Sequence, residues 1–339
     1  MIKLNDPMIQ KYLTPFKYPY PVLNGTGEKG AFDEKSVDIP FVFMHKDRFH
    51  MVYTGYDGKG YQSALAVSDD LLHWEPVGIM IPRDAESSTA WDSVGCAITW
   101  LIKESDDFND VAKLRKIDGK YWAVYHSYPQ KGYEAGPAEI GLAWTQDENL
   151  LDWHRFDAPV FSWKDGNEWE SGGLYKACII RNDDRWYMFY NAKNSAKRWI
   201  EQTGVAVSDD LFHWSRPVAE PVLKVTENAW DGRFVSDPYI LKDGDKWLNF
   251  YFGYNSAHAM EGLAISSDLI HWEKVEEPII ASEKGWLDEE HAHKASIFNY
   301  NGVLYHFYCA TRPYREGDAT CVYNAFRTIA VAASKKWED

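Results

Sequence analysis

Short apolar runs alternate with polar turns along the whole chain. The strongest runs are rich in aromatic and β-branched residues, and glycine or aspartate turns separate them. They are His50–Tyr53, Trp122–Tyr125, Trp186–Tyr190, Trp247–Tyr251 and Leu304–Tyr308. Runs of this length and composition, bounded by turn residues, are typical of β-strands. The pattern therefore predicts an all-β protein.

The apolar runs belong to a unit that recurs along the chain. A motif of the type Ser-Asp-Asp-Leu-x-His-Trp ends at Trp74 and at Trp214. A copy that is one residue shorter ends at Trp272, and a looser copy ends at Trp153. Each unit also opens on an aromatic residue followed by an acid: Phe32-Asp33, Trp91-Asp92, Trp169-Glu170, Trp230-Asp231 and, more loosely, Trp286 with Asp288. Four strands in a repeat of roughly 60 residues describe a blade of a β-propeller.

We therefore predict a single five-bladed β-propeller domain over residues 1–339. The blades are placed at about 31–82, 90–163, 168–225, 229–282 and 286–337. The last unit lacks a fourth strand, and residues 18–25 supply a match in Pro21-Val22-Leu23. We expect this N-terminal strand to complete blade 5 and close the ring, which protects edges that an open sheet would expose.

Composition narrows the partners and the compartment. The 339 residues carry a formal net charge of −15 without a long Lys/Arg run, which excludes nucleic acid and disfavours an anionic membrane. A small, neutral carbohydrate fits this charge better. The four cysteines form no CxxC pair, the N-terminus has no apolar leader segment and no run is long enough for a membrane span. These features predict a cytoplasmic protein, or a secreted or periplasmic one if a signal peptide has been removed.

Residues that recur in every unit are interpreted as structural, and polar residues that break the repeat as functional candidates. His73, His213 and His271 belong to the first class, as do the recurring acids, which we expect to cap backbone amides. Among those acids Glu170 stands apart as the only glutamate, and two glycines after it leave space beside it. Aligning the inner strands gives one column that consists of Ile39, Ile98, Lys176, Asp237 and Lys294.

Further polar residues point to the same central funnel. Asp38 precedes Ile39, and an extra residue before Pro40 would bring it into line with Asp237. The last inner strand adds Glu290, His291 and His293, and the second strands end near His126, Asn191 and Arg312. Unpaired charges in a core are costly, so several of them entering one funnel indicate a site. The alternative is a buried salt-bridge network in which Lys176 and Lys294 neutralise the acids.

The motifs around these residues resemble the propeller glycoside hydrolases. Val37-Asp38-Ile39-Pro40 is similar to the opening blade of family 43, where an Asp-Pro supplies the general base. Arg233-Phe-Val-Ser-Asp237-Pro238 resembles the second Asp-Pro of families 43 and 32, whose Asp orients the substrate and tunes the acid. His291-Ala292-His293-Lys294 is similar to family 117, where a His there has been proposed as the acid. This chain reads Asp-Ile-Pro in the first blade, and both Glu170 and Glu290 compete for the general-acid Glu of family 43.

The resemblance implies a glycoside hydrolase that cleaves an oligosaccharide or glycoside, exo-acting and inverting. Cleavage needs one protonated acid at the leaving oxygen and one base that activates water. The expected roles are Asp38 as base, Asp237 as orienter and Glu170 as acid, with His293 as the competitor. The expected substrate-binding residues are His126, Lys176, Asn191, Glu290, His291, Lys294 and Arg312. No cofactor is required. Some related propellers hold a calcium or other divalent ion in the central funnel, but no ligand spacing here demands one.

Two other functions stay open. Family 130 shares the propeller and cleaves with phosphate, an anion that Lys176, Lys294, Arg312 and His293 could hold. Its Arg-Glu-Asp-Pro phrase is absent from this chain. A non-catalytic carbohydrate-binding propeller is the other alternative, and it predicts no acid pair within catalytic distance.

Overall fold

The computed structural model describes residues 1–337, and its regular secondary structure is almost entirely β-strand. Three short 3-10 turns are present within this range: η1 (Gln10–Tyr12), η2 (Trp163–Asp165) and η3 (Glu168–Glu170). In the described residues no helix is long and apolar enough to cross a membrane. The all-β prediction is confirmed. Residues 338 and 339 of the predicted domain lie outside the described residues.

The strands form antiparallel groups that follow one another along the chain. The first group is β2 (Ser36–His45), β3 (Arg48–Tyr56), β4 (Tyr61–Ser68) and β5 (Glu75–Ile81). The second is β6 (Ala97–Leu101), β7 (Tyr121–Ser127), β8 (Glu139–Thr145) and β9 (His154–Arg155). The third is β10 (Leu174–Asn182), β11 (Arg185–Lys193) and β12 (Glu201–Ser208).

The remaining strands make two more groups. The fourth is β13 (Phe234–Asp243), β14 (Lys246–Tyr254), β15 (Ala259–Ser266) and β16 (Trp272–Lys274). The fifth is β17 (His291–Tyr300), β18 (Val303–Pro313), β19 (Ala325–Ala333) and β1 (Phe16–Lys17). Single parallel pairings, Glu201 with Phe234 and Ala259 with His291, link the third, fourth and fifth groups.

The N-terminal segment joins the last group of strands. Phe16 pairs with Ala333, and the Val22 amide donates to the Ile329 carbonyl at 2.9 Å. Leu23 also bridges Ile329, as Phe161, Leu223 and Ile280 bridge the third strands of groups two to four. The predicted segment 18–25 therefore lies on β19, and its pairing begins two residues earlier, at Phe16.

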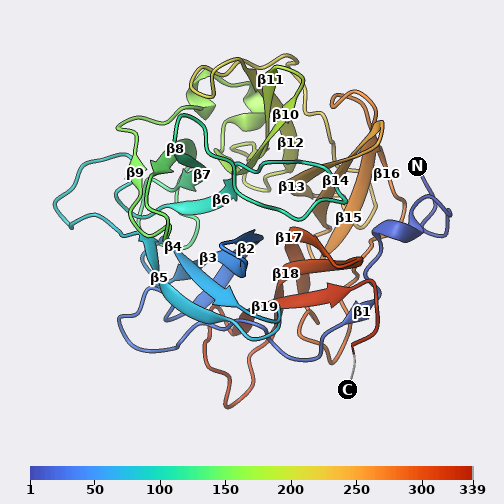
Figure 1. The fold of residues 1–339 in the computed structure, drawn as a ribbon, viewed down its shortest axis with the longest axis horizontal. Coiled ribbons are helices and arrows are strands. Elements are labelled where there is room, and N and C mark those ends of the chain that lie inside the picture. The colour runs from blue at the N-terminus through green and yellow to red at the C-terminus, as the bar shows by residue number, and fades with distance from the viewer. Residues whose placement is uncertain (338–339) are drawn as a thin grey trace.

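The first strands of the five groups surround the centre of the molecule (Figure 1). Contacts run from β2 to β6, then to β10, β13 and β17, and from β17 back to β2. Side chains that leave these inner strands toward the centre therefore meet one another, although they come from distant parts of the sequence.

The recurring phrases have structural roles. In the His-Trp turns, Asp70 accepts from the backbone amides of Leu72 and His73, and the Trp74 indole donates to the Leu71 carbonyl. The recurring acids mostly accept from a tyrosine hydroxyl of the second strand, rather than capping strand amides as predicted. The pairs are Asp92 with Tyr125, Glu170 with Tyr190, Asp231 with Tyr251 and Asp288 with Tyr308. These bonds fasten the leading segments of groups two to five to their second strands, whereas Asp33 in the first group accepts from Thr26.

Candidate active site

A bulge in the inner strands aims side chains at the funnel. The antiparallel register slips at the same place in β2, β10, β13 and β17. There the backbone of a non-glycine residue has a positive φ: Ile39 (50°), Lys176 (40°), Asp237 (58°) and Lys294 (68°). Such bulges re-aim a side chain, and left-handed non-glycine residues concentrate at functional sites. This is the column that the sequence alignment singled out, and its first member is Ile39, not Asp38.

The bulges open into a pocket of about 300 Å³. Its polar lining includes Lys176, Asp237 and Lys294 from the bulges, and its wall is aromatic, with Tyr175 and Trp199 among the rings. Two residues further along the inner strands, Phe41, Trp100 and Tyr239 are fully buried and pack against one another. Their ring centroids lie 5.0 Å (Phe41–Trp100) and 4.7 Å (Trp100–Tyr239) apart. These three rings fill the centre beneath the bulges and leave a pocket that is open on one side.

Two of the pocket's carboxyl groups, Glu201 and Asp237, form an interacting pair. Glu201 Oε1 accepts from the Trp199 indole at 2.9 Å, and Oε2 accepts from the Ser236 hydroxyl at 3.0 Å. Burial, with the nearby charge of Glu134, raises the pKa of Glu201. Burial also raises the pKa of Asp237 to about 7, against the lowering effect of Lys294 and Lys176 and with a contribution from Glu201. Near neutral pH these two carboxyl groups therefore retain a proton more readily than free carboxyl groups do.

Asn191 connects the two acids. With its amide oriented to match its neighbours, the nitrogen donates to Asp237 Oδ1 at 3.1 Å and to the Tyr175 carbonyl at 2.9 Å. The other amide atom, then an oxygen, lies 3.5 Å from Glu201 Oε2. A carbonyl oxygen facing a carboxyl oxygen suits the protonated acid, because only that form has a hydrogen to donate.

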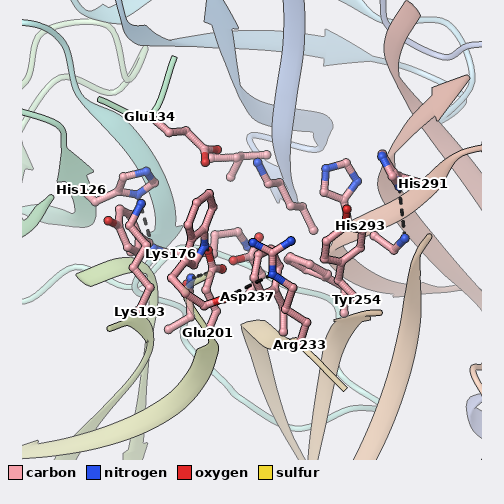
Figure 2. A pocket seen from close by; sticks show the side chains of 18 of the residues that line it. His126, Glu134, Lys176, Lys193, Glu201, Arg233, Asp237, Tyr254, His291 and His293 are labelled. Carbon is pink, nitrogen blue, oxygen red and sulfur yellow. Dashed lines mark hydrogen bonds between the residues drawn. The ribbon is translucent and has the colours of Figure 1, made fainter. Parts of the chain in front are cut away.

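A third carboxylate, Glu134, comes from a different element. It lies in the connection between β7 and β8, between Gly132 and Gly136, and has a φ of 49°. It lines the same pocket, and Figure 2 shows it on the opposite side from Glu201 and Asp237. Glu134 and Glu201 were missed from the sequence. The signal for Glu134 was the length of its connection, which exceeds those between β3 and β4 and between β14 and β15.

Comparison with known proteins places this chain in a family. Residues 103–285, more than half of the chain, match the model described as "Glycosyl hydrolases family 32 N-terminal domain". The protein belongs to this family. The chain therefore belongs to the superfamily of propeller glycoside hydrolases, as the motifs had indicated.

The proteins to which this chain is similar include a phosphorylase and several propellers of known structure. A Beta-1,2-mannobiose phosphorylase from Thermoanaerobacter sp. (strain X514) is 26% identical over 130 residues, which cover 34% of this chain and 42% of that relative. A solved RGII complex of the protein BT0996 is 28% identical with a TM-score of 0.80, over 97% of this chain and 94% of its own. A structure of the GH130 family of mannoside phosphorylases, 14% identical with a TM-score of 0.68 over 94% of each chain, shares the fold. Together they indicate a carbohydrate-active enzyme.

Asp38 has a different place in the structure from the one predicted. Its side chain is fully buried, and its Oδ2 accepts from Lys294 Nζ at 2.7 Å and from Arg327 at 2.9 Å. These two cations hold the pKa of Asp38 far below its usual range, although burial opposes them. A carboxylate so strongly stabilised is a poor proton acceptor, and it lies behind the pocket wall. We therefore do not retain Asp38 as the base; it anchors the cation Lys294, as the salt-bridge alternative expected.

Glu170 does not lie among the residues that line the pocket. It closes a capping box on η3, and its carboxylate accepts from Arg216 Nε at 2.8 and 3.0 Å and from the Tyr190 hydroxyl at 2.7 Å. The space expected from Gly172 and Gly173 is occupied, because a Cβ there would meet backbone atoms at 2.5 and 2.6 Å. We correct the assignment of Glu170 as acid, since its carboxylate fastens the leading segment of the third group to Tyr190 on β11 and to Arg216 after β12.

This reassignment of Glu170 gives a testable expectation. Replacing Glu170 with Gln leaves the partly buried guanidinium of Arg216 without its counter-charge, so the free energy of unfolding should fall by about 3 kcal/mol. The turnover rate per folded molecule should stay within about twofold of wild type, because the pocket is untouched. Thermal unfolding and kinetics at 20 °C measure the two effects, and a loss of turnover without a loss of stability would restore Glu170 as the acid.

The other predicted residues divide into two sets. His126, Lys176, Asn191, His291, His293 and Lys294 line the pocket together. Arg312 does not, because its guanidinium forms a two-pronged ion pair with Asp318 at 2.6 and 2.7 Å. Glu290 also lies outside the lining, and its contact with His258 is made by its main-chain carbonyl. The structure therefore removes Arg312 and Glu290 from the predicted binding set.

His293 is unsuited to the role of general acid. Its Nδ1 lies 2.9 Å from the Cys309 carbonyl and so carries a hydrogen, which leaves Nε2 as an acceptor in the neutral ring. Burial and the neighbouring Lys294 lower the pKa of His293 well below that of a free imidazole. A neutral imidazole at neutral pH has no proton to give from Nε2, so we drop His293 as a competitor for the acid.

Within the described residues, the side chains that come closest to a metal site are Asp38, His293 and Cys309, whose ligand atoms lie within 4.8 Å of one another. The set does not fit the calcium ion seen in some related propellers. Calcium takes six to eight oxygen ligands, and this group offers one carboxylate, whose charge Lys294 and Arg327 already neutralise.

Proposed function

We propose that this chain is an exo-acting, inverting glycoside hydrolase in which Glu201 is the general acid, Glu134 the general base and Asp237 the residue that keeps the acid protonated. One observation carries the proposal. Three carboxyl groups from separate elements converge in one aromatic-walled pocket, with a proton-holding pair on one side and a lone carboxylate on the other. Hydrolysis of a glycosidic bond needs this division into acid and base.

The acid side supplies a proton to the leaving oxygen. Asp237 lies next to Glu201 in a buried setting, so ionising both at once is unfavourable and the pair retains one proton. Ser236 and Trp199 fix the Glu201 carboxyl. When the glycosidic bond breaks, the proton moves from Glu201 to the oxygen of the departing sugar. The pair then becomes more negative next to the cations Lys176 and Lys294, which stabilise it.

The base side activates water. Glu134 has no cation within ion-pair distance among the described residues. Its Oε1 accepts only a long hydrogen bond from the Tyr61 hydroxyl, at 3.5 Å, so the carboxylate can still accept a proton. Water held between Glu134 and the anomeric carbon attacks from the face opposite the leaving group and inverts its configuration. Because the buried rings of Phe41, Trp100 and Tyr239 fill the centre beneath the pocket, a glycan cannot thread through it. A terminal sugar fits this geometry better than an internal one.

The ring of inner strands is part of this proposal. We infer that the five antiparallel groups are the five blades of one closed propeller, with the N-terminal segment as the outer strand of blade 5. The circular contacts of β2, β6, β10, β13 and β17 support this interpretation. Closure would hold Glu201, Asp237 and Glu134, which come from three different blades or their connections, at fixed separations.

Phosphorolysis is the second candidate, and two observations favour it. The relative from Thermoanaerobacter is named as a phosphorylase. Lys176 lines the pocket with no carboxylate within ion-pair distance among the described residues, so it could hold an anion. Arg312, which the sequence had suggested as a phosphate ligand, is not available for this role, because its guanidinium forms an ion pair with Asp318. A non-catalytic propeller is disfavoured, because a binding site for neutral sugars needs no proton-holding acid pair.

A release assay tests the proposal. Wild-type protein is incubated with aryl glycosides, β-1,2-linked mannosides and RGII oligosaccharides, with and without phosphate, and products are separated by chromatography. Release of one terminal sugar without phosphate, lost in both Glu201→Gln and Glu134→Gln, is the expected result. Release that depends on phosphate would assign the protein to the phosphorylases. A matched control is Glu220→Gln, an exposed glutamate outside the pocket.

The pH dependence of cleavage follows from the acid pair. The Glu201–Asp237 pair must hold a proton for the acid to act, and the pKa of Asp237 is about 7. The value of kcat/KM should therefore fall about tenfold per pH unit once the pair has lost that proton. Replacing Asp237 with Asn removes the negative neighbour of Glu201, so the alkaline limb should move to lower pH. Initial rates between pH 4 and 9 measure both profiles. An alkaline limb that stays in place in Asp237→Asn would contradict the coupling of the two acids.

A further inference from the structure

The pocket wall beside Glu201 carries two cations that form no ion pair among the described residues, although the charge of one of them, Lys193, lowers the pKa of Glu201. Arg233 Nε donates to the Trp199 carbonyl at 3.3 Å, and no carboxylate lies within ion-pair distance of its guanidinium among the described residues. Lys193 Nζ lies 4.7 Å from the ring centre of Tyr175 and 5.3 Å from that of Trp199, also without an ion-pair partner in the described part of the chain.

Five other partly or fully buried arginines of this protein are neutralised, whereas the partly buried Arg115 forms no ion pair among the described residues. Ion pairs join Arg83 to Asp57, Arg155 to Asp84 and Asp92, Arg216 to Glu170, Arg312 to Asp318 and Arg327 to Asp38. The chain has an excess of 15 acidic charges, so carboxylates to pair with Arg233 are not scarce. Leaving Arg233 and Lys193 unpaired on a pocket wall therefore keeps their donors free for something that enters the pocket.

Packing holds both cations in place. The Arg233 guanidinium lies 5.0 Å from the ring centres of Trp199 and Phe234 and 5.7 Å from that of Tyr254. Stacking on rings orients the planar guanidinium and leaves its terminal N–H groups free, which is the arrangement that binds a carboxylate through two hydrogen bonds. In Figure 2, Lys193 and Arg233 lie on the two sides of Glu201, away from Glu134.

The strand register explains this position. Glu201 pairs with Lys193 across β11 and β12, its amide donates to the Arg233 carbonyl at 3.1 Å, and it bridges Phe234 on β13. The two cations are therefore main-chain neighbours of Glu201 in the same sheet. Neither of them is the direct partner of its carboxylate, since Trp199 and Ser236 donate to those oxygens.

We infer that Arg233 and Lys193 form a subsite for a carboxylate carried by the leaving-group sugar, so the natural substrate contains an acidic sugar. The inference rests on the proposed role of Glu201, because the general acid lies beside the leaving group. A free phosphate that attacks the anomeric carbon arrives on the opposite face. Its place would be on the side of Glu134, so the cations beside Glu201 favour a sugar carboxylate over inorganic phosphate.

Binding measurements separate this inference from the proposed catalysis. The probes are methyl glucuronide and methyl galacturonide, their neutral counterparts methyl glucoside and methyl galactoside, and inorganic phosphate. Each is titrated calorimetrically into wild type and into Glu134→Gln, which lacks the proposed base and keeps the subsite. We expect at least one uronide to bind about tenfold more tightly than its neutral counterpart, in keeping with charge-assisted hydrogen bonds.

The variants then locate the effect. Arg233→Gln and Lys193→Gln should each abolish most of the preference for the uronide, and Arg233→Lys should restore part of it. Arg198→Gln, a change at an exposed arginine outside the pocket lining, should leave it intact. The subsite is overturned if no uronide is preferred, if the preference survives Arg233→Gln, or if phosphate alone binds through Arg233. A uronide preference in a protein that cleaves no glycan would leave the subsite standing and remove the proposed hydrolase.

Discussion

Replacing Glu201 with Gln should lower kcat by about 10³ on natural glycans while the fold stays intact. A positioned general acid contributes typically 10²–10⁴ to the rate. Gln keeps the volume of the side chain and can retain contacts with Trp199 and Ser236, but it has no acidic proton to give. Kinetics on an oligosaccharide substrate, with thermal unfolding to confirm the fold, measure the effect.

The leaving group provides an internal control for this assignment. The phenolate of an aryl glycoside with an acidic phenol leaves without being protonated. Glu201→Gln should therefore lose much less activity on such a substrate than on a natural glycan. Glu134→Gln should lose similar activity on both, because water activation is needed whatever the leaving group. Equal losses of Glu201→Gln on both substrates would rule out its role as proton donor.

Replacing Asp38 with Asn should produce the largest loss of stability among the substitutions considered. The change leaves Lys294 and Arg327 buried without their shared counter-charge. Removing one partner of a buried ion pair costs about 3–5 kcal/mol, which corresponds to a fall in Tm of roughly 10 °C. Differential scanning calorimetry at pH 7 measures it.

An exposed ion pair supplies the matched control. Asp69→Asn breaks the contact with Arg48 at the surface, where both partners are accessible, so the loss should stay below about 1 kcal/mol. The pKa of Asp38 is depressed in the folded protein, so its stabilising effect is present above the ordinary carboxyl pKa of about 4 and fades as the pH falls further. A Tm difference no larger than that of Asp69→Asn would show that Asp38 is not the anchor of these cations.

The fold could be predicted because its signals are local and repeated. The turn phrases ending at Trp74 and Trp214 and the strong second strands recur often enough to define the units without a structure. The same alignment brought out the column of Lys176, Asp237 and Lys294, because a bulge at one fixed place in each inner strand gives these residues the same offset from the aromatic–acid pair.

The acids were harder to predict because their positions depend on non-local packing. A bulge places Ile39, not Asp38, beside Asp237 in the column, and a one-residue shift moves a side chain to the other face. Glu170 looked exceptional in the sequence, but Arg216, distant along the chain, accounts for it. Glu134 lies in an irregular connection and has no repeat to be compared with. Glu201 opens β12, where the third strands of groups one and four have Tyr61 and Ala259, so a comparison of third strands would have brought it out.

The central claim is that Glu134 directs water to a sugar activated by Glu201, and isotope transfer tests it most directly. Wild type and Glu134→Gln are incubated with the substrate found in the release assay, in phosphate-free buffer made with ¹⁸O-labelled water, and the released sugar is analysed by mass spectrometry. The account predicts one ¹⁸O atom at the anomeric carbon of the sugar from wild type, and at least a hundredfold less labelled product from Glu134→Gln. Labelled release that proceeds equally in Glu134→Gln, or release that requires phosphate and carries no ¹⁸O, would contradict it.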